Sequence, residues 1–284
     1  MRIVVVAGLL VLIGLIATIV LARVRWRAAT EELTARLDRA GAPATPSAIL
    51  PQEIDNLPAP VARYMRAALG ARPRAIATAR VRWRGDFLAR PGPDGWRPFQ
   101  ANQVFQTRPA GFVWDARVRM APGLDVFVRD AFADGAGSMR GAILGLIPVV
   151  DVSGTPEIAA GALQRYLAEA VWFPTALLPR HGVRWTALDD SSARATLTVG
   201  SISVSCDFRF GADGLVESVY SPSRFRDVNG SAVPTPWEGR LARHVERAGV
   251  RVPAAGEVAW ILPEGRMPYW RGELVDLVHI FEEE

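Results

Sequence analysis

From residue 76 onwards, apolar and polar residues alternate along much of the chain. In ARVRWRGDF at 79–87, Val81 and Trp83 fall on one face, and three arginines fall on the other. The same alternation recurs at 99–106, 111–120, 124–132, 182–188, 193–199 and 202–210. A period of two is typical of strands with one buried face, and short turns between such strands give an antiparallel sheet.

A helix is expected in the middle of this strand-rich region. Thr155 is a good N-cap residue, Pro156 suits the first helical position, and the apolar spacing continues to about Trp172 before Pro174. The apolar, glycine-rich stretch 139–154 has no decisive period. We therefore predict an α+β fold, a curled, half-barrel-like antiparallel sheet of about ten strands with a central helix, because a sheet this large must curl or close.

Aromatic residues gather on the predicted inner face of the sheet and at the end of the central helix. The chain contains nine tryptophans. Concave sites lined with aromatic side chains commonly bind small apolar molecules, although the same residues also build ordinary cores. Our candidate ligand-binding residues are Trp83, Trp114, Tyr166, Trp172, Phe173 and Trp185. Trp172 and Phe173 act either as a lid over a pocket or as part of a filled core.

An uncharged apolar run covers Ile3 to Ala22. At 1.5 Å per residue it spans roughly 30 Å, the thickness of a hydrocarbon core. A cleaved signal peptide is the alternative, but its apolar region is usually shorter and ends at a small-residue cleavage site. We expect residues 3–22 to be a retained, single-pass contact with the bilayer.

The side of the membrane is harder to infer from the flanking charges. The arginines that follow the run favour a cytoplasmic domain by the positive-inside rule. A very short N-terminal tail, however, usually stays inside while the chain behind it is exported. We expect an extracytoplasmic domain.

Prolines and a change of pattern divide the chain into three parts. We expect a transmembrane anchor at 1–22, a juxtamembrane helix and Pro-rich linker at 23–57, and a single β-rich domain at 58–284.

All 33 basic residues are arginine, and the formal net charge is +4. Acidic residues are scattered among the arginines, which argues against a nucleic-acid-binding protein. Arg80, Arg82 and Arg84 form a stripe on one strand face. The stripe is either a solvated face or a contact with an anionic surface such as lipid head groups or an acidic partner.

The sequence contains no recognised catalytic, nucleotide-binding or metal-binding motif. The three histidines are far apart, and the single cysteine, Cys206, lies on an apolar strand face where a thiol is inert. We expect no metal ion, no cofactor and no catalytic residues. His181 is the one histidine whose role is worth testing, together with Glu169 or Asp130 as a scattered acid–base site.

Three segments together resemble a bacterial family of unknown function whose members carry an N-terminal membrane helix. They are LPAPVARYMRAAL at 57–69, WRPFQANQVFQTRPAGFVWDA at 96–116, and the stretch from Leu163 to Asp190. The resemblance covers roughly residues 55 to 275 and implies no activity. More loosely, a helix inside a curled sheet resembles the half-barrel of periplasmic lipoprotein carriers.

These observations support three hypotheses. The first is a membrane-anchored protein that binds an apolar or lipid-like ligand without catalysis. The second is an envelope scaffold or assembly protein that binds a protein partner. The third is an enzyme with the scattered acid–base site described above.

Overall fold

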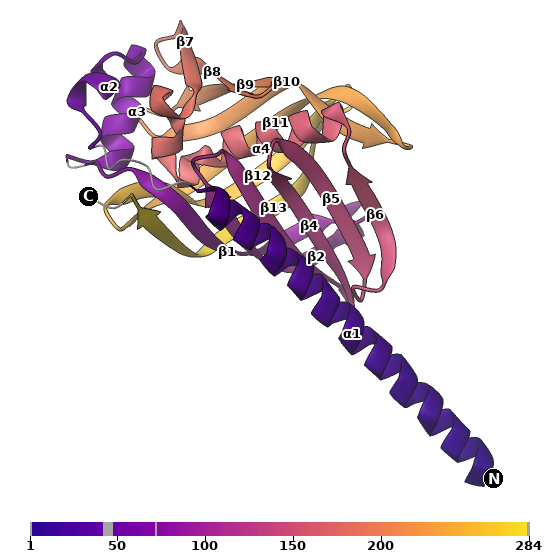
Figure 1. Ribbon diagram of the computed structural model, residues 1–284. Helices are drawn as coiled ribbons and strands as arrows, with labels where there is room; N and C mark the ends of the chain where they lie inside the picture. The colour runs from indigo at the N-terminus through magenta and orange to yellow at the C-terminus, as the bar shows by residue number, and fades with distance from the viewer. Residues whose placement is uncertain (1, 42–47, 72, 283–284) are drawn as a thin grey trace.

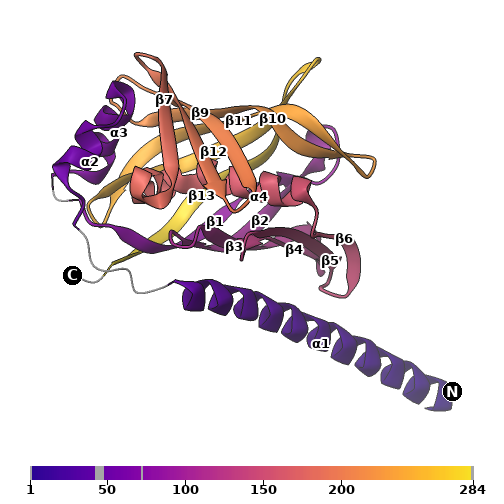
Figure 2. The same cartoon turned by 45° about the horizontal axis from the view of Figure 1, so that its top comes forward.

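The computed structural model describes residues 2–41, 48–71 and 73–282. One helix, α1 (Arg2–Ala40), extends away from the rest of the molecule. It is the one helix among the described residues that is long and apolar enough to cross a membrane. Its apolar half projects freely, whereas its second half lies along the outer face of the sheet (Figures 1 and 2).

The sheet contains thirteen strands in one continuous antiparallel array. The strands are β1 (Ile76–Leu88), β2 (Trp96–Gln106), β3 (Gly111–Ala121), β4 (Leu124–Ala133), β5 (Ala136–Ile143), β6 (Ile147–Ser153), β7 (Val183–Asp189), β8 (Ser192–Val199), β9 (Ile202–Phe210), β10 (Val216–Val228), β11 (Ser231–Arg247), β12 (Val250–Leu262) and β13 (Gly265–Phe281). Their order is β6-β5-β4-β3-β2-β1-β13-β12-β11-β10-β9-β8-β7. The first and last strands in sequence are therefore paired at the middle of the sheet.

This order leaves β6 and β7 as the two edges. The chain builds outward from β1 to β6, crosses to the opposite edge at β7, and returns strand by strand to β13. The crossing segment contains the helix α4 (Pro156–Glu169), which lies in the concave face of the curled sheet (Figure 2). α1 and α4 consequently lie on opposite faces.

The prediction of about ten strands was too low. Two of the additional strands, β5 and β6, come from residues 136–153, most of which fall in the stretch whose period was undecided. The third is β11, in which Pro234 and Pro236 argue against a strand. A register shift between Ser221 and Arg224 of β10 accompanies these prolines, and pairing continues on both sides of it.

The remaining helices are short. They are α2 (Pro51–Asp55), α3 (Ala59–Leu69) and the 3-10 turns η1 (Pro93–Gly95), η2 (Ala170–Trp172), η3 (Pro174–Leu177) and η4 (Pro179–His181). Thr155 caps α4 as predicted, accepting a bond from the Ile158 amide at 3.3 Å. The α-helix ends at Glu169, and the last turn to Trp172 is 3-10.

Part of the expected linker belongs to the folded domain. Ile49, Ile54 and Leu57 are buried in the main core, and Ile54 lies in α2. Residues 42–47 of that segment lie outside the described residues. The main core fills the space between the concave face of the sheet and α4, and α3 closes one end of it.

Candidate functional site

Five of the six predicted aromatic residues meet on the concave face. Trp83 of β1 packs edge-on against Trp172, with ring centroids 4.8 Å apart. Phe173 lies 5.4 Å from Tyr166. Trp114 points to the same face from β3. The sixth, Trp185, is half-buried on β7, one of the two edge strands. Its Nε1 donates to the Leu177 carbonyl at 2.8 Å.

Side chains fill this concave face in the structure. Trp172 is only 4% exposed, and Phe173 is fully buried. The segment 156–178, comprising α4, η2 and η3, supplies these side chains, and we call it the plug. In the chain, the plug connects the edge strand β6 to the edge strand β7. Its covalent connections to the sheet are therefore only at its two ends.

A chain of polar groups crosses the interface between the plug and the sheet. Arg165 of α4 binds Asp130 of β4 at 2.7 Å and Glu169 of α4 at 2.9 Å. Glu169 accepts a bond of 2.7 Å from Gln103 of β2, and Gln103 in turn accepts one of 2.9 Å from Trp83 Nε1. These groups lie deep among aromatic rings.

The aromatic rings and the neighbouring charges define the electrostatics of this network. The Arg165 guanidinium lies 5.0 Å from the centre of the Trp114 ring, which favours a cation over its face. Burial raises the pKa of Glu169, while Arg165 and Gln103 act in the opposite direction. Replacing a buried ion network with apolar residues is often neutral or stabilising, so the network is weak evidence for a permanently closed core.

Further polar contacts join the plug to the opposite half of the sheet. They are Gln164 with Ser221 at 2.7 Å, Arg224 with the Gly161 carbonyl at 2.8 Å, Trp172 Nε1 with the Pro253 carbonyl at 2.8 Å, and His279 Nε2 with the Trp172 carbonyl at 2.8 Å. The plug thus contacts both halves of the curled sheet.

Sequence reasoning found the aromatic residues of this face but not the polar network. Gln103 and Asp130 belong to different strands, and only the pairing register brings them beside α4. One feature of the sequence could have indicated this network: Arg165 is followed four residues later by Glu169, on a helix that packs on the core.

The structure does not bring His181 into an interaction with the two proposed carboxylates. Asp130 and Glu169 both bind Arg165, whereas the charged groups that influence His181 are Arg108, Arg180 and Glu53. Burial, followed by the two arginines, lowers the pKa of His181 to about 4. Within the described residues, no group of three or more histidine, cysteine, aspartate or glutamate side chains is arranged to hold a metal ion.

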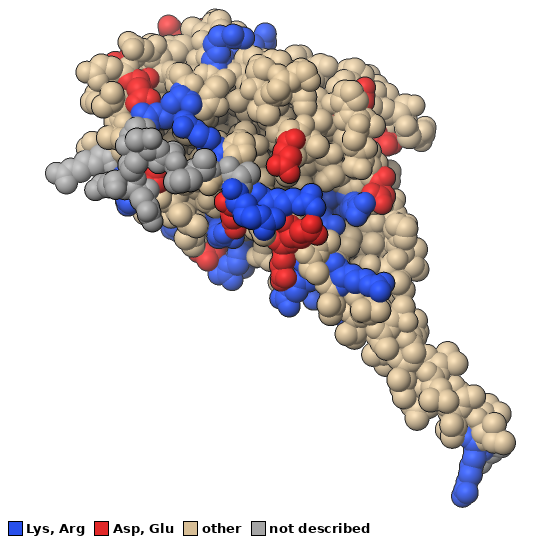
Figure 3. Space-filling view, viewed as in Figure 1, with Lys and Arg blue, Asp and Glu red and all other residues tan. Residues whose placement is uncertain are grey.

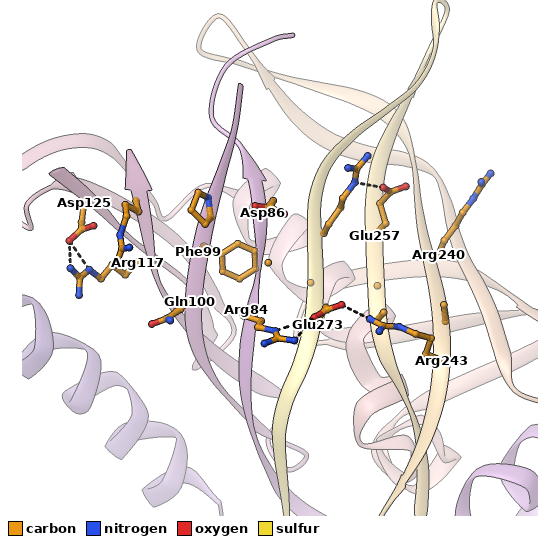
Figure 4. Close-up of a pocket in the computed structure, with 18 residues that line it drawn as sticks. Arg84, Asp86, Phe99, Gln100, Arg117, Asp125, Arg240, Arg243, Glu257 and Glu273 are labelled. Atoms are coloured by element: carbon orange, nitrogen blue, oxygen red, sulfur yellow. Dashed lines mark hydrogen bonds and ion pairs between the residues drawn. The ribbon is translucent and has the colours of Figure 1, made fainter. Parts of the chain in front are cut away.

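The outer face of the sheet carries a separate hollow of about 780 Å³ with many charged residues in its lining (Figure 4). Six arginines and four carboxylates from β1, β3, β4, β11, β12 and β13 line it, together with Gly85, Gly256 and Gly272. Glu273 binds Arg84 at 2.9 Å and Arg243 at 2.7 Å across the hollow.

Each arginine of the predicted stripe is exposed and has an acidic partner. Arg80 binds Asp38 of α1 at 3.2 Å, Arg82 binds Asp276 at 3.1 Å, and Arg84 binds Glu273. The stripe therefore borders the hollow at Arg84 and contacts the second half of α1 at Arg80.

Residues 55–278 match the model of a family of unknown function, DUF6920. The chain belongs to this family. The matched residues include the plug, twelve strands in full and β13 up to Val278, and they agree closely with the extent expected from the sequence. Comparison with curated proteins found no match.

Two solved structures are similar at low sequence identity. One is a LolA superfamily protein from Nitrosomonas europaea, with 10% identity and a TM-score of 0.36, covering 81% of this chain and 93% of that one. The other is a β-barrel-like protein of a second family of unknown function, DUF1849, from Brucella abortus. Its identity is 10% and its TM-score 0.26, and the match covers 72% of this chain and 99% of that one. The first is the looser resemblance expected from the sequence.

Proposed function

We propose that this protein is anchored in a membrane by α1 and binds an apolar, lipid-like ligand on the concave face of its sheet when the plug moves aside. The observation that carries this proposal is the construction of that face. A row of aromatic side chains is covered by one continuous segment, which is joined to the sheet only at the two unpaired edges. Displacing the plug exposes an apolar groove without breaking any strand pair.

The contacts of the plug support its displacement. Arg165, Glu169 and Gln103 are strongly polar groups at a surface that a permanent core would build from apolar side chains. In addition, the buried Nε1 of Trp114 has no hydrogen-bond partner among the described residues. A ligand with an apolar chain and an oxygen-bearing head would satisfy both the aromatic face and this donor.

The proposal of a membrane anchor is supported by α1, which runs without a break from the apolar run into the β-rich domain. Its second half belongs to the domain: Trp26 Nε1 donates to Asp115 at 2.8 Å, and Leu37 is buried against Val113 and Ala131. A helix built this way holds the domain at a fixed position beside the bilayer. We propose a single-pass protein with the β-rich domain on the extracytoplasmic side.

A photoreactive phospholipid tests the proposal directly. The full chain is placed in nanodiscs containing a phospholipid with a diazirine on its acyl chain, irradiated, digested and mapped by mass spectrometry. We expect adducts on α1, which report the anchor, and also on inner-face strand residues such as Trp83 and Phe105. Adducts confined to α1 would agree with membrane anchoring and would contradict lipid binding on the concave face.

The outer hollow favours one alternative, the binding of an acidic protein partner beside the arginine stripe. Exposed ion pairs usually contribute less than about 1 kcal/mol, so replacing the stripe should leave the fold intact. We expect Arg80→Glu, Arg82→Glu and Arg84→Glu together to abolish a dominant in-cell cross-link, and the matched triple change to Gln to weaken it. Unchanged cross-linking in the Glu variant would make the stripe a solvated face.

A further inference from the structure

The end of the β5–β6 hairpin exposes an unusual concentration of apolar side chains. Ile147 and Val149 are 56% and 52% exposed, and Leu146 is 41% exposed. Val150 and Val152 continue the exposed apolar surface along β6, which is an edge strand with every residue exposed. The neighbouring β3–β4 turn adds Leu124, which is 40% exposed. We call residues 144–152 together with Leu124 the apolar tip.

The apolar tip contacts α1 where the apolar run of that helix ends. A side chain added at Gly145 would lie 3.6 Å from the backbone of Ala22. Ala22 is consequently only 7% exposed, although the preceding Leu21 is 49% exposed. Figure 1 shows α1 leaving the domain beside this end of β5 and β6, and Figure 3 shows basic side chains at the same place, where the apolar run of α1 has ended.

The contacts of α1 with the sheet hold the tip at this level. Arg129 donates to the Trp26 carbonyl at 3.1 Å and to Thr30 at 2.9 Å, and its guanidinium lies 4.7 Å from the centre of the Trp26 ring. Trp26 lies about one helical turn beyond Ala22, a depth at which tryptophan is enriched in membrane proteins. If residues 3–22 span the bilayer, the tip lies at the boundary between head groups and hydrocarbon.

The turn at the tip has an uncommon residue at its first central position. Leu144 and Gly145 both have positive φ, 56° and 74°, and the Leu146 amide closes the turn onto the Ile143 carbonyl at 2.9 Å. This backbone favours Asn-Gly or Asp-Gly. Elsewhere the chain uses such pairs at Asp134-Gly135 and Asn229-Gly230, and a small residue at Ala248-Gly249, so Leu144 is the bulky one among these turns. A branched apolar residue in the left-handed region is strained, and such strain is concentrated at functional sites.

We infer that the apolar tip inserts into the surface of the same bilayer that holds α1. This inference rests on the proposed anchor and does not depend on ligand binding by the groove. Together, α1 and the tip fix two points of the domain on the membrane. They orient the β6 edge, where the plug begins, towards the lipid.

The test uses fluorophores attached to single cysteines in the full chain, in nanodiscs that contain lipids with a nitroxide on the acyl chain. The native cysteine is first removed as Cys206→Ala. An environment-sensitive fluorophore is then attached at Leu146→Cys in the tip, at Leu12→Cys in α1, or at Leu188→Cys on β7. Leu188 is a matched control, since it is a leucine with 48% exposure at the opposite edge of the sheet.

We expect strong nitroxide quenching at positions 12 and 146, and none at 188. Quenching at 12 without quenching at 146 would contradict insertion of the apolar tip and would still agree with α1 as a membrane anchor. Absence of quenching at 12 rejects the anchor on which the inference rests. Pairing of β6 with a second copy would shield position 146 from water without nitroxide quenching, and that outcome also overturns membrane insertion.

A second pair of variants separates insertion from folding. Leu144→Asn suits the backbone of the turn and removes an apolar side chain, so we expect an intact fold with weaker quenching at 146. Asn229→Asp, in the matched turn between β10 and β11, should leave quenching at 146 unchanged. Equal quenching in wild type and Leu144→Asn would show that Leu144 makes no contribution to insertion, contrary to the inference.

Discussion

Glu169 combines a buried carboxylate with contacts to both the plug and the sheet. Burial raises its pKa above 4.5, so the folded state holds the proton more tightly than the unfolded chain does. The stabilising contribution of the Glu169 carboxyl is fully present below its pKa in the unfolded chain. It is lost as the pH rises through its pKa in the folded state. Ionisation of the buried carboxylate as the pH rises therefore weakens the closed state.

The change Glu169→Gln tests this sign. Glutamine preserves the shape and a bond to Gln103, and Asp130 remains as a partner for Arg165. We expect the free energy of unfolding of the variant, relative to wild type, to increase between pH 4 and pH 7. Denaturant titration of the full chain at several pH values measures this difference. A relative decrease over the same range would mean that the charged carboxylate stabilises the fold.

His181 should show the opposite dependence on pH. Its folded pKa is about 4, below the unfolded value of 6.5, so its contribution is complete above pH 6.5 and is lost as the pH falls towards 4. The loss amounts to at most about 3 kcal/mol. The variant His181→Gln should be less sensitive to acid than wild type in thermal unfolding. Equal acid sensitivity would show that His181 is not held neutral by the fold.

At the scale of elements, the backbone of α4 lies against Gly137 of β5. A side chain added there would lie 2.5 Å from the Ile158 carbonyl oxygen and 2.7 Å from Ala159 Cα, so the helix would have to move. Gly161, within α4 itself, has open space at the corresponding atom. These two glycines give a matched pair of alanine substitutions.

We predict that Gly137→Ala displaces the start of α4 and increases binding of a fluorescent fatty acid to the full chain. Gly161→Ala should stabilise α4 by up to about 1 kcal/mol, because alanine favours a helix over glycine, and should not increase binding. Circular dichroism checks that the sheet persists in both variants. Equal binding by the two variants would argue against a movable plug.

The sequence predicts those elements whose signals are local. The alternation around Trp83 and Trp114 and the cap at Thr155 correctly located strands and the central helix. β6 was missed because an edge strand exposed on both faces has no alternation of burial, and β11 was missed because of its prolines.

The candidate site, too, was predicted only where the signal is local in the sequence. Its aromatic residues follow from strand periodicity, whereas the contact between Asp130 and Arg165 depends on how α4 lies across distant strands. The filled state of the concave face depends on packing between the plug and strands separated by tens of residues in sequence. No local pattern carries that information.

At the scale of the whole molecule, the topology separates the sheet from its cover. Every strand pair is antiparallel, and each strand pairs only with other strands, so none of the pairings uses residues 156–178. In the proposed arrangement, α1 and the apolar tip hold the sheet beside the membrane, and the plug is the part that moves. The central claim is therefore that the plug opens while the sheet stays folded.

Cys206 reports this opening without any substitution. It is the single cysteine, 1% exposed on β9, with its Sγ 3.9 Å from the Gln164 carbonyl of α4. Burial raises its pKa to about 12, so the covered thiol is inert.

The decisive measurement is the rate of maleimide labelling of Cys206 in the folded, full-length protein. We predict labelling faster than global unfolding, accelerated by Gly137→Ala and unaffected or slowed by Gly161→Ala. Labelling at the rate of global unfolding, equal in wild type and Gly137→Ala, would show that residues 156–178 are a permanent part of the core.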